Sequence, residues 1–238
     1  MSFINEDLLE QYGIPLDGEQ KERLECFHGL LCEWNRVMDL TNVPEEEMTL
    51  RHYADSLMPA FQYPRLFHEA KSLIDVGTGA GFPGILLAIR YPGMRVTLLE
   101  AQQKRCDFLE KVKQKADLKG VQIVHMRAED GGKSPAFREK FDVSVARAVA
   151  SLPVLMEYLL PFVRVGGNML AWKGPGVREE MQAGTAAAGM LGGGEILLHP
   201  VSLPGMEHLL VQIPKVRATP ALYPRKAGLP AKKPLGKH

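Results

Sequence analysis

The sequence predicts an α/β fold: a mostly parallel seven-stranded sheet covered by helices, with an antiparallel strand near the C-terminus and a helical extension at the N-terminus. Three patterns predict it. From residue 72 onward, short apolar runs alternate with amphipathic segments, as in strand-helix-strand units. The last two apolar runs stand too close together for a crossover helix. The first 65 residues instead carry apolar side chains at helical spacing.

A helix is expected over residues 17–34. Leu24, Phe27 and Leu31 recur near the helical period, with polar residues between them. Asp17 and Gln20 stand three residues apart, the spacing at which the first side chain caps the backbone and the second reaches back to it. We therefore expect residues 1–65 to form a helical cap on the sheet.

The α/β part follows in order along the chain. Parallel strands joined by helices need right-handed crossovers, which cover both faces of the sheet. Segment 181–194, rich in Ala and Gly, should be a helix that ends in a flexible turn, and the runs 195–198 and 208–213 should pair antiparallel. The other expected strands are 73–76, 95–100, 121–124, 141–146 and 168–172, and the expected helices are 82–91, 103–116 and 152–163. Three parts result: the extension 1–65, a ligand-binding domain 66–215 and a basic tail 216–238.

Composition places the chain among ordinary globular proteins. Of 238 residues, 45% are hydrophobic and 24% charged. The most apolar stretch, 143–163, carries Arg147 and Glu157 and is broken by two prolines, so it does not read as a membrane span. The N-terminus lacks the pattern of a signal peptide. We expect a cytoplasmic protein.

Metal ligands are not evident in the sequence. The three cysteines form no CxxC pair, and the seven histidines form no HxH or HxxxH pair. We expect reduced thiols, no disulfide framework and no metal site.

Charge is distributed unevenly along the chain. Residues 1–50 hold twelve acidic residues against three basic ones, whereas residues 208–238 hold seven Lys or Arg and no acid. A basic, Pro-rich end favours a partner with dense negative charge, most simply nucleic acid. A solvated tail that only keeps the protein soluble is the alternative.

A glycine-rich turn follows the first expected strand. Gly77, Gly79 and Gly81 allow the backbone to turn sharply and to approach a ligand closely, at the sheet edge where open α/β folds bind ligands. The dinucleotide pattern would need a sixth-position glycine where the chain has Phe82. A phosphate loop starting at Gly79 would need Lys and Ser or Thr, where residues 85–86 are Ile and Leu.

The observed pattern, Asp-x-Gly-x-Gly-x-Gly from Asp75, resembles motif I of the S-adenosylmethionine methyltransferases. A carboxylate suits the ammonium and sulfonium of that cofactor. The alternative is an acidic strand end before a tight turn. Glu100, which closes the next strand, is placed to accept the ribose hydroxyls, and Glu129 in the following acidic loop is placed near the adenine edge. A solvated acidic loop is the alternative for these residues.

Motifs over nearly the whole chain resemble one bacterial family, the 16S ribosomal RNA guanine-N7 methyltransferase G family, also called glucose-inhibited division protein B. They are 34–35, 40–41, 51–52, 55–56, 75–84, 104–105, 108–109, 127–129, 141–142, 147–150, 166–167, 173, 223–228 and 233–235. The resemblance implies a class I S-adenosylmethionine methyltransferase fold. It also implies methyl transfer from S-adenosylmethionine to N7 of one guanine in the 16S rRNA of the small ribosomal subunit or its precursor.

Site residues follow from the resemblance together with the loop pattern. We expect seven residues to contact the cofactor: Gly77, Gly79, Phe82, Glu100, Ala128, Glu129 and Arg147. Ala101 stands where many members of the family have a polar residue, so no hydrogen bond is expected from that side chain. Arg147 is also expected to contact the RNA. Five further residues, an aromatic ring among cations, are expected to do so: Tyr223, Arg225, Lys226, Lys232 and Lys233.

Arg147 is the side chain with the most open role. Its planar fork of donors suits the cofactor, a guanine edge or a phosphate. A salt bridge to a local acid such as Asp75 is the alternative. His52 and Asp55 either line the entrance to the site or form a plain helix-packing pair.

Guanine N7 presents an in-plane lone pair and no proton, so no general base, and hence no catalytic residue, is expected. Positioning alone is worth on the order of 7 to 11 kcal/mol in favourable models. The Asn/Asp-Pro-Pro-Tyr motif of amine methyltransferases is absent at 147–150, and Cys106 lies in a helix away from the position of a cytosine-C5 nucleophile.

Three hypotheses remain open from sequence: an rRNA methyltransferase, a methyltransferase of small molecules or proteins on the same fold, and a non-catalytic RNA-binding module. The first is expected to act as a monomer on 16S rRNA, without a membrane partner.

Overall fold

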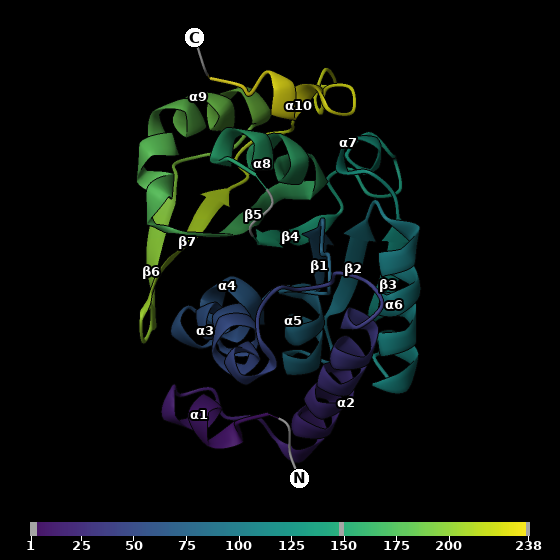
Figure 1. Ribbon diagram of the computed structural model, residues 1–238. Helices are drawn as coiled ribbons and strands as arrows, with labels where there is room; N and C mark the ends of the chain where they lie inside the picture. The colour runs from purple at the N-terminus through teal and green to yellow at the C-terminus, as the bar shows by residue number, and fades with distance from the viewer. Residues whose placement is uncertain (1–3, 148–149, 237–238) are drawn as a thin grey trace.

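The computed structural model describes residues 4–147 and 150–236. A seven-stranded sheet with the order β3-β2-β1-β4-β5-β7-β6 forms its centre (Figure 1). β1 pairs parallel with β2 and β4, β2 with β3, and β4 with β5, while β7 pairs antiparallel with β5 and β6. The predicted mostly parallel sheet and the antiparallel pairing near the C-terminus are both confirmed. The strands are β1 Ser72–Val76, β2 Arg95–Glu100, β3 Val121–His125, β4 Phe141–Arg147, β5 Val163–Lys173, β6 Leu197–Leu203 and β7 Met206–Pro214.

The strand order reverses between β1 and β4. From β1 the chain runs outward through β2 to β3 and then returns to β4 on the other side of β1. Such a switch point leaves a crevice at the carboxyl ends of the strands, where open α/β sheets bind their ligands. The glycine-rich turn follows β1 at this edge.

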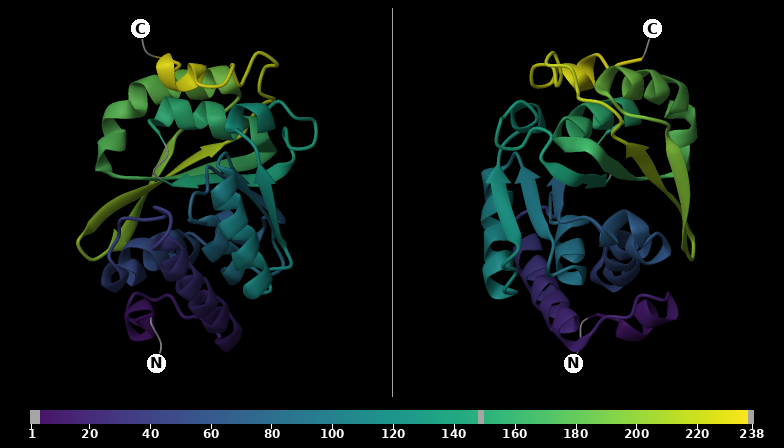
Figure 2. Two further views of the ribbon diagram at one scale, coloured as in Figure 1. Left: turned by 45° about the vertical axis from the view of Figure 1, so that its right-hand side comes forward. Right: turned by 180° about the vertical axis from the view of Figure 1, so that it is seen from behind.

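Helices cover both faces of the sheet (Figure 2). The core on one face gathers side chains from the N-terminal helices and from α5 and α6, and the core on the other face gathers those of α8 and α9. Neighbouring residues of β1 divide between them: Leu73 joins the first core, and Ile74 and Val76 the second. The α-helices are α1 Glu6–Gln11, α2 Gly18–Asn35, α3 Asp55–Gln62, α4 Arg65–His68, α5 Gly84–Arg90, α6 Gln103–Lys115, α7 Ala128–Gly131, α8 Leu152–Leu159, α9 Met181–Leu191 and α10 Leu229–Lys232.

Shorter helical turns connect these elements. A 3₁₀ turn, η1 (Glu45–Glu47), and a π-helix, η2 (Thr49–Ala54), lead into α3. Two more 3₁₀ turns, η3 (Leu160–Phe162) and η4 (Pro175–Glu180), follow α8 and β5. No helix of the described chain is both long and apolar enough to cross a membrane.

The N-terminal capping box forms as predicted. The Asp17 carboxylate accepts a hydrogen bond from the Gln20 amide at 2.9 Å, and the Gln20 side chain accepts one from the Asp17 amide at 3.1 Å. α2 then buries Leu24, Phe27 and Leu31 and packs on α5 and α6. The N-terminal helices therefore form a cap over one face of the sheet.

Several predicted boundaries were wrong. The helix expected over 152–163 ends at Leu159, the strand expected over 168–172 begins at Val163, and the run expected at 195–198 lies in β6, Leu197–Leu203. The helix after the glycine turn begins at Gly84 rather than at residue 82, because Phe82 and Pro83 still belong to the turn. The glycines after α9 do not form a loose turn. Gly192 ends the helix in the left-handed conformation, and Gly193 pairs with Lys215 in a β-bridge.

The basic C-terminal segment packs against the α/β part. The Arg138 guanidinium donates hydrogen bonds to the carbonyl oxygens of Thr219, at 2.6 Å, and Tyr223, at 2.8 Å. The Lys215 ammonium is buried and donates to Thr219 Oγ1 at 2.6 Å. This segment lies beside α8 and α9 (Figure 1). The division of the chain at 65/66 and 215/216 stays a prediction.

Candidate functional site

The glycine turn after β1 depends on glycine for its shape. Gly77, Gly79 and Gly81 have φ values of +71°, +60° and +98°, in the region that disfavours other residues. A Cβ on Gly81 would lie 2.6 Å from the Ile85 side chain. The Gly77 amide donates to the Leu99 carbonyl at 2.8 Å, which ties the turn to the end of β2.

Asp75 holds this turn from beneath. Its Oδ2 accepts hydrogen bonds from Thr78 Oγ1 at 2.7 Å and from the Gly84 amide at 2.8 Å, and so joins the two ends of the turn. The side chain is fully buried, and this burial raises the pKa of Asp75 to about 7. The carboxylate does not line the adjacent cavity. Through Oδ2 the acid therefore shapes the turn, and its attraction for the cofactor ammonium stays a prediction.

A cavity of about 280 Å³ lies over the carboxyl ends of β1, β2 and β3. Four residues expected at the cofactor line it: Gly77, Glu100, Ala128 and Glu129. The other lining residues are Val76, Leu99, Ala101, Met126, Arg127, Tyr158 and Gly228. Acids therefore stand at the rim of a space with largely apolar walls.

Glu100 is fixed at the rim by backbone amides. Its Oε2 accepts from the Gly79 amide at 3.0 Å, and its Oε1 accepts from the amides of Ala101 and Gln102, both at 2.9 Å. Gly79, absent from the lining, thus contributes through Glu100. A carboxylate has about four lone-pair sites, so this group can still accept a hydrogen bond from one hydroxyl group in the cavity.

Glu129 links the cavity to the C-terminal segment. Its buried Oε1 accepts a hydrogen bond from the Gly228 amide at 2.7 Å. Tyr158 of α8 lines the same cavity, and desolvation raises the pKa of its hydroxyl group. Sequence reasoning missed both Tyr158 and Gly228. Residues 223–228 carried a family resemblance that could have indicated the second, but they were assigned to RNA.

Phe82 and Arg147 do not line this cavity. Arg147, at the end of β4, lies with its guanidinium carbon 4.7 Å from the centre of the Phe82 ring. The His52 ring also stacks on the Phe82 ring, with the two ring centroids 4.5 Å apart. Phe82 therefore joins the glycine turn to the N-terminal cap. Direct contact of these two residues with the cofactor stays a prediction.

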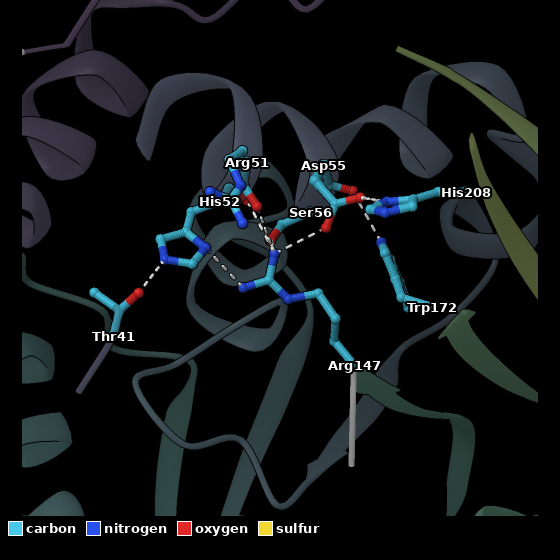
Figure 3. Close-up of polar contacts among 8 residues, drawn as sticks. All are labelled: Thr41, Arg51, His52, Asp55, Ser56, Arg147, Trp172 and His208. Carbon is cyan, nitrogen blue, oxygen red and sulfur yellow. Dashed lines mark hydrogen bonds and ion pairs between the residues drawn. The ribbon is translucent and has the colours of Figure 1, made fainter. Parts of the chain in front are cut away.

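The Arg147 guanidinium binds several groups of the cap (Figure 3). Its Nη1 donates to Asp55 Oδ2 at 2.9 Å and to Ser56 Oγ at 3.3 Å, and Nη2 donates to His52 Nδ1 at 3.2 Å. The salt-bridge partner is therefore Asp55 rather than Asp75. Asp55 Oδ2 forms a direct ion pair with Arg147, whereas Asp75 acts on the Arg147 charge only by a longer-range electrostatic attraction.

The same contacts fix the state of His52. Because Nδ1 accepts from Arg147, the ring proton lies on Nε2, which donates to Thr41 Oγ1 across 2.6 Å. Burial, and then the charge of Arg147, lower the pKa of His52 to about 4. His52 is neutral at physiological pH.

Asp55 connects this network to the C-terminal strands. Its Oδ1 lies 2.6 Å from His208 Nδ1 of β7, and its carbonyl oxygen accepts from Trp172 Nε1 of β5 at 2.9 Å. Beside these groups lies a second, larger cleft of about 720 Å³. Its lining comprises Val43, Arg51, His52, Asp55, Arg147, Trp172, Lys173, Gly174, Pro175, Gly205, Met206, Glu207 and His208. His52 and Asp55 thus line a cleft and also pack the cap on the sheet.

The expected RNA-binding residues of the tail have different surroundings. Arg225 donates from Nε and Nη2 to the two carboxylate oxygens of the fully buried Glu157, at 2.9 and 2.6 Å. Its guanidinium is therefore engaged within the fold, and its contact with RNA stays a prediction. Tyr223 is half-buried, while Lys226, Lys232 and Lys233 are exposed. Lys237, which belongs to the same basic segment, lies outside the described residues, as do positions 148–149 of the 147–150 motif.

One cluster of potential metal ligands occurs among the described residues. His28, Cys32 and Glu45 bring their ligand atoms within 4.8 Å of one another. Cys32 Sγ lies 3.6 Å from His28 Nε2, and His28 Nδ1 lies 2.6 Å from the Tyr53 hydroxyl. These ligands come from α2 and η1 and form no CxxC, HxH or HxxxH pair, so their spacing in the sequence does not indicate the cluster.

Comparisons with known proteins match this architecture. Cofactor-bound Rv0187 from MTB aligns with a TM-score of 0.57 at 18% identity, covering 89% of this chain and 96% of that chain. A putative O-methyltransferase from Klebsiella pneumoniae aligns with a TM-score of 0.56 at 16% identity, with the same coverages of 89% and 96%. At these identities the likeness concerns the fold alone, and it confirms the predicted class I methyltransferase fold.

Comparisons of sequence find relatives of higher identity than these structures. The family model GidB, described as rRNA small subunit methyltransferase G, matches residues 20–207. The ribosomal RNA small subunit methyltransferase G of Alkaliphilus metalliredigens is 43% identical over 236 residues, with 98% of each chain covered. That of Acetivibrio thermocellus is 45% identical over 227 residues, covering 94% of this chain and 92% of the relative. The chain belongs to the GidB family, the rRNA small subunit methyltransferases G.

Proposed function

We propose that this protein transfers a methyl group from S-adenosylmethionine to N7 of one guanine in 16S rRNA. The observation that carries the proposal is the cavity lined by Gly77, Glu100 and Glu129 at the switch point of the sheet. The names of its relatives, ribosomal RNA small subunit methyltransferase G, support the choice of acceptor.

The residues of the cavity fit an adenosine group. Glu100 stands at the end of β2 with its carboxylate held in place, and its remaining acceptor site can take a ribose hydroxyl. Leu99 and Met126 supply apolar surface for a base, and the missing Cβ of Gly77 permits a close approach to the backbone. When bound, the cofactor supplies an electrophilic methyl group on a sulfonium.

The protein side of the reaction is positioning. Guanine N7 carries a lone pair and no proton, so the chain needs no general base. Neither His52, which is neutral and bonded on both nitrogens, nor the buried Asp75 has to move a proton. The residues that hold cofactor and guanine in line supply the rate enhancement.

We place the acceptor on the side of Arg147. The cleft beyond this residue is larger than the cofactor cavity, about 720 Å³, and has several basic side chains on its walls. Lys226, Lys232 and Lys233 add exposed positive charge on the C-terminal segment. An RNA substrate in a bacterial small subunit corresponds to a cytoplasmic enzyme, and we propose that it acts as a monomer.

The test is methyl transfer from labelled S-adenosylmethionine. Small subunits from cells that lack the modification serve as acceptor, with total protein and metabolite extracts as rival acceptors and the Gly77→Asp variant as a negative control. Label in the 16S rRNA with the wild type alone supports the proposal. Label on protein or metabolites would favour another methyltransferase activity, and RNA binding without transfer would favour a binding module.

A further inference from the structure

The large cleft beside Arg147 holds one basic group that differs from the others. Arg51 is paired with Glu47 at 2.6 Å, Lys173 with Glu180 at 3.1 Å and Arg147 with Asp55 at 2.9 Å. Each of these cations is thus paired with a carboxylate, and Arg147 shares Asp55 with His208. The other basic residues on the cleft wall are the neutral His52 and His208 of β7.

His208 is bound on one side and open on the other. Its Nδ1 lies 2.6 Å from Asp55 Oδ1, so Nδ1–H donates to the carboxylate. Its Nε2 has no hydrogen-bond partner among residues 4–147 and 150–236, and the side chain is 33% exposed. Figure 3 shows the ring fixed against Asp55, on the side of that residue away from Arg147. The second nitrogen is therefore an oriented and unused donor.

We propose that the cleft receives the acceptor RNA and that His208, as an imidazolium held by Asp55, donates from Nε2 to a phosphate oxygen beside the target guanine. This inference rests on the proposed function and assigns the phosphate contact within it. His208 is the contact residue. Asp55 is a positioning residue, which keeps the ring oriented.

A phosphate suits this group better than the guanine edge does. Methylation at N7 places positive charge on the guanine ring, and an imidazolium at the neighbouring O6 would oppose that charge. A phosphate is already anionic, so its bond to the imidazolium is charge-assisted before and after transfer.

The surroundings of His208 set its charge. The hydrogen bond to Asp55 raises the pKa of the imidazole, against the effects of burial and of the Arg147 charge. The other ionisable groups on the cleft are Arg51, Lys173 and Glu207, together with the neutral His52. Because its pKa is raised, the His208 imidazole stays protonated to a higher pH than a free histidine does. The phosphate contact therefore weakens once the pH rises above the pKa of His208.

The experiment compares His208→Gln with His208→Arg. We measure KM for small subunits lacking the modification, KM for S-adenosylmethionine, and the Kd of the free 16S rRNA, from pH 6 to pH 9. In the wild type, KM for the subunit should increase with pH. In His208→Gln it should be about tenfold higher at low pH, the effect of one lost charge-assisted hydrogen bond, and should no longer follow the titration. In His208→Arg it should stay low across the range, because arginine remains charged.

KM for S-adenosylmethionine should be unchanged in both variants, which shows that the fold and the cofactor cavity are intact. His199→Gln is the matched control, since His199 lies on β6, outside the cleft lining, and bonds to Gln212 at 2.8 Å. A wild-type KM for the subunit in His208→Gln, or a wild-type pH profile in His208→Arg, would overturn the assignment. If the wild type transfers no methyl group to RNA, the proposed function fails, while the RNA Kd of the variants still decides whether His208 binds phosphate.

Discussion

Arg147 and Asp55 form a buried ion pair 92 residues apart in the chain, with 2.9 Å between Nη1 and Oδ2. The pair connects the end of β4 in the α/β sheet to the first residue of α3 in the N-terminal cap. It also stands beside the large cleft and near the glycine turn, which Arg147 contacts through Phe82. The cap is therefore bonded into the site, and changes at this pair affect both stability and function.

Removal of the Arg147 side chain should destabilise the protein as well as abolish methyl transfer. Arg147→Ala leaves the buried Asp55 carboxylate without its guanidinium partner, and breaking such a pair costs about 3 to 5 kcal/mol. Urea unfolding measures the loss. Arg147→Lys keeps the charge but loses the fork of donors, so it should be less destabilised and still impaired in transfer. If Arg147→Ala unfolds at the wild-type urea concentration, the pair has no structural role.

Gly77→Asp should abolish cofactor binding and leave the protein folded. The residue has φ +71°, a conformation that costs a non-glycine residue on the order of 1 to 2 kcal/mol, and its new carboxylate would project from the backbone that lines the cavity. Isothermal titration with S-adenosylmethionine measures the affinity. Gly93→Asp is a matched control because a Cβ there meets open space. Unchanged affinity in Gly77→Asp would show that the cofactor binds elsewhere.

His52 should make stability depend on pH. The pKa of His52 falls from 6.5 to about 4 on folding, so below pH 6.5 the unfolded chain binds a proton that the folded chain does not. The contribution of the neutral, buried His52 to the free energy of unfolding is about 3 kcal/mol at most. It is fully present above pH 6.5 and is lost as the pH falls towards 4. Position 52 cannot titrate in His52→Gln. The free energy of unfolding of this variant should therefore decrease less between pH 6.5 and pH 4 than that of the wild type. Parallel curves for the two proteins would contradict the burial of a neutral His52.

The cations of the C-terminal segment should separate into two groups. Arg225→Ala leaves the fully buried Glu157 unpaired and should lower the free energy of unfolding by about 3 to 5 kcal/mol. Changing Lys226, Lys232 and Lys233 to Ala should leave stability nearly unchanged. That triple variant should bind RNA more weakly and reduce the salt slope by about 2 if all three contact phosphates. A wild-type slope would mean that these lysines serve only solubility.

Much of the fold could be predicted because it depends on local patterns. The capping pair Asp17 and Gln20, the apolar runs of the strands and the glycines of the turn each act within a few residues, and the structure confirms them. The start of α5 could not be placed from such patterns. Phe82 and Pro83 look like the first turn of a helix, but Asp75 binds the Gly84 amide and the helix begins there.

The site was predictable only in part, for a related reason. Gly77 and Glu100 at strand ends, and Glu129 in α7 after β3, come together because the topology places them on one edge. The partners of Arg147 come from a helix cap whose orientation depends on tertiary packing, so spacing could not show that the acid is Asp55. Arg225 looked like an exposed cation because Glu157, its partner, is 68 residues away.

Mapping the methylated nucleotide tests the assignment to guanine N7 in 16S rRNA. After transfer with S-adenosylmethionine, the 16S rRNA is reduced with borohydride and treated with aniline, which cleaves the chain at N7-methylguanosine, and the ends are located by primer extension. One new cleavage site, at a guanine, should appear with the wild type and not with Gly77→Asp. Labelled RNA that resists cleavage, or label spread over many positions, would contradict the assignment.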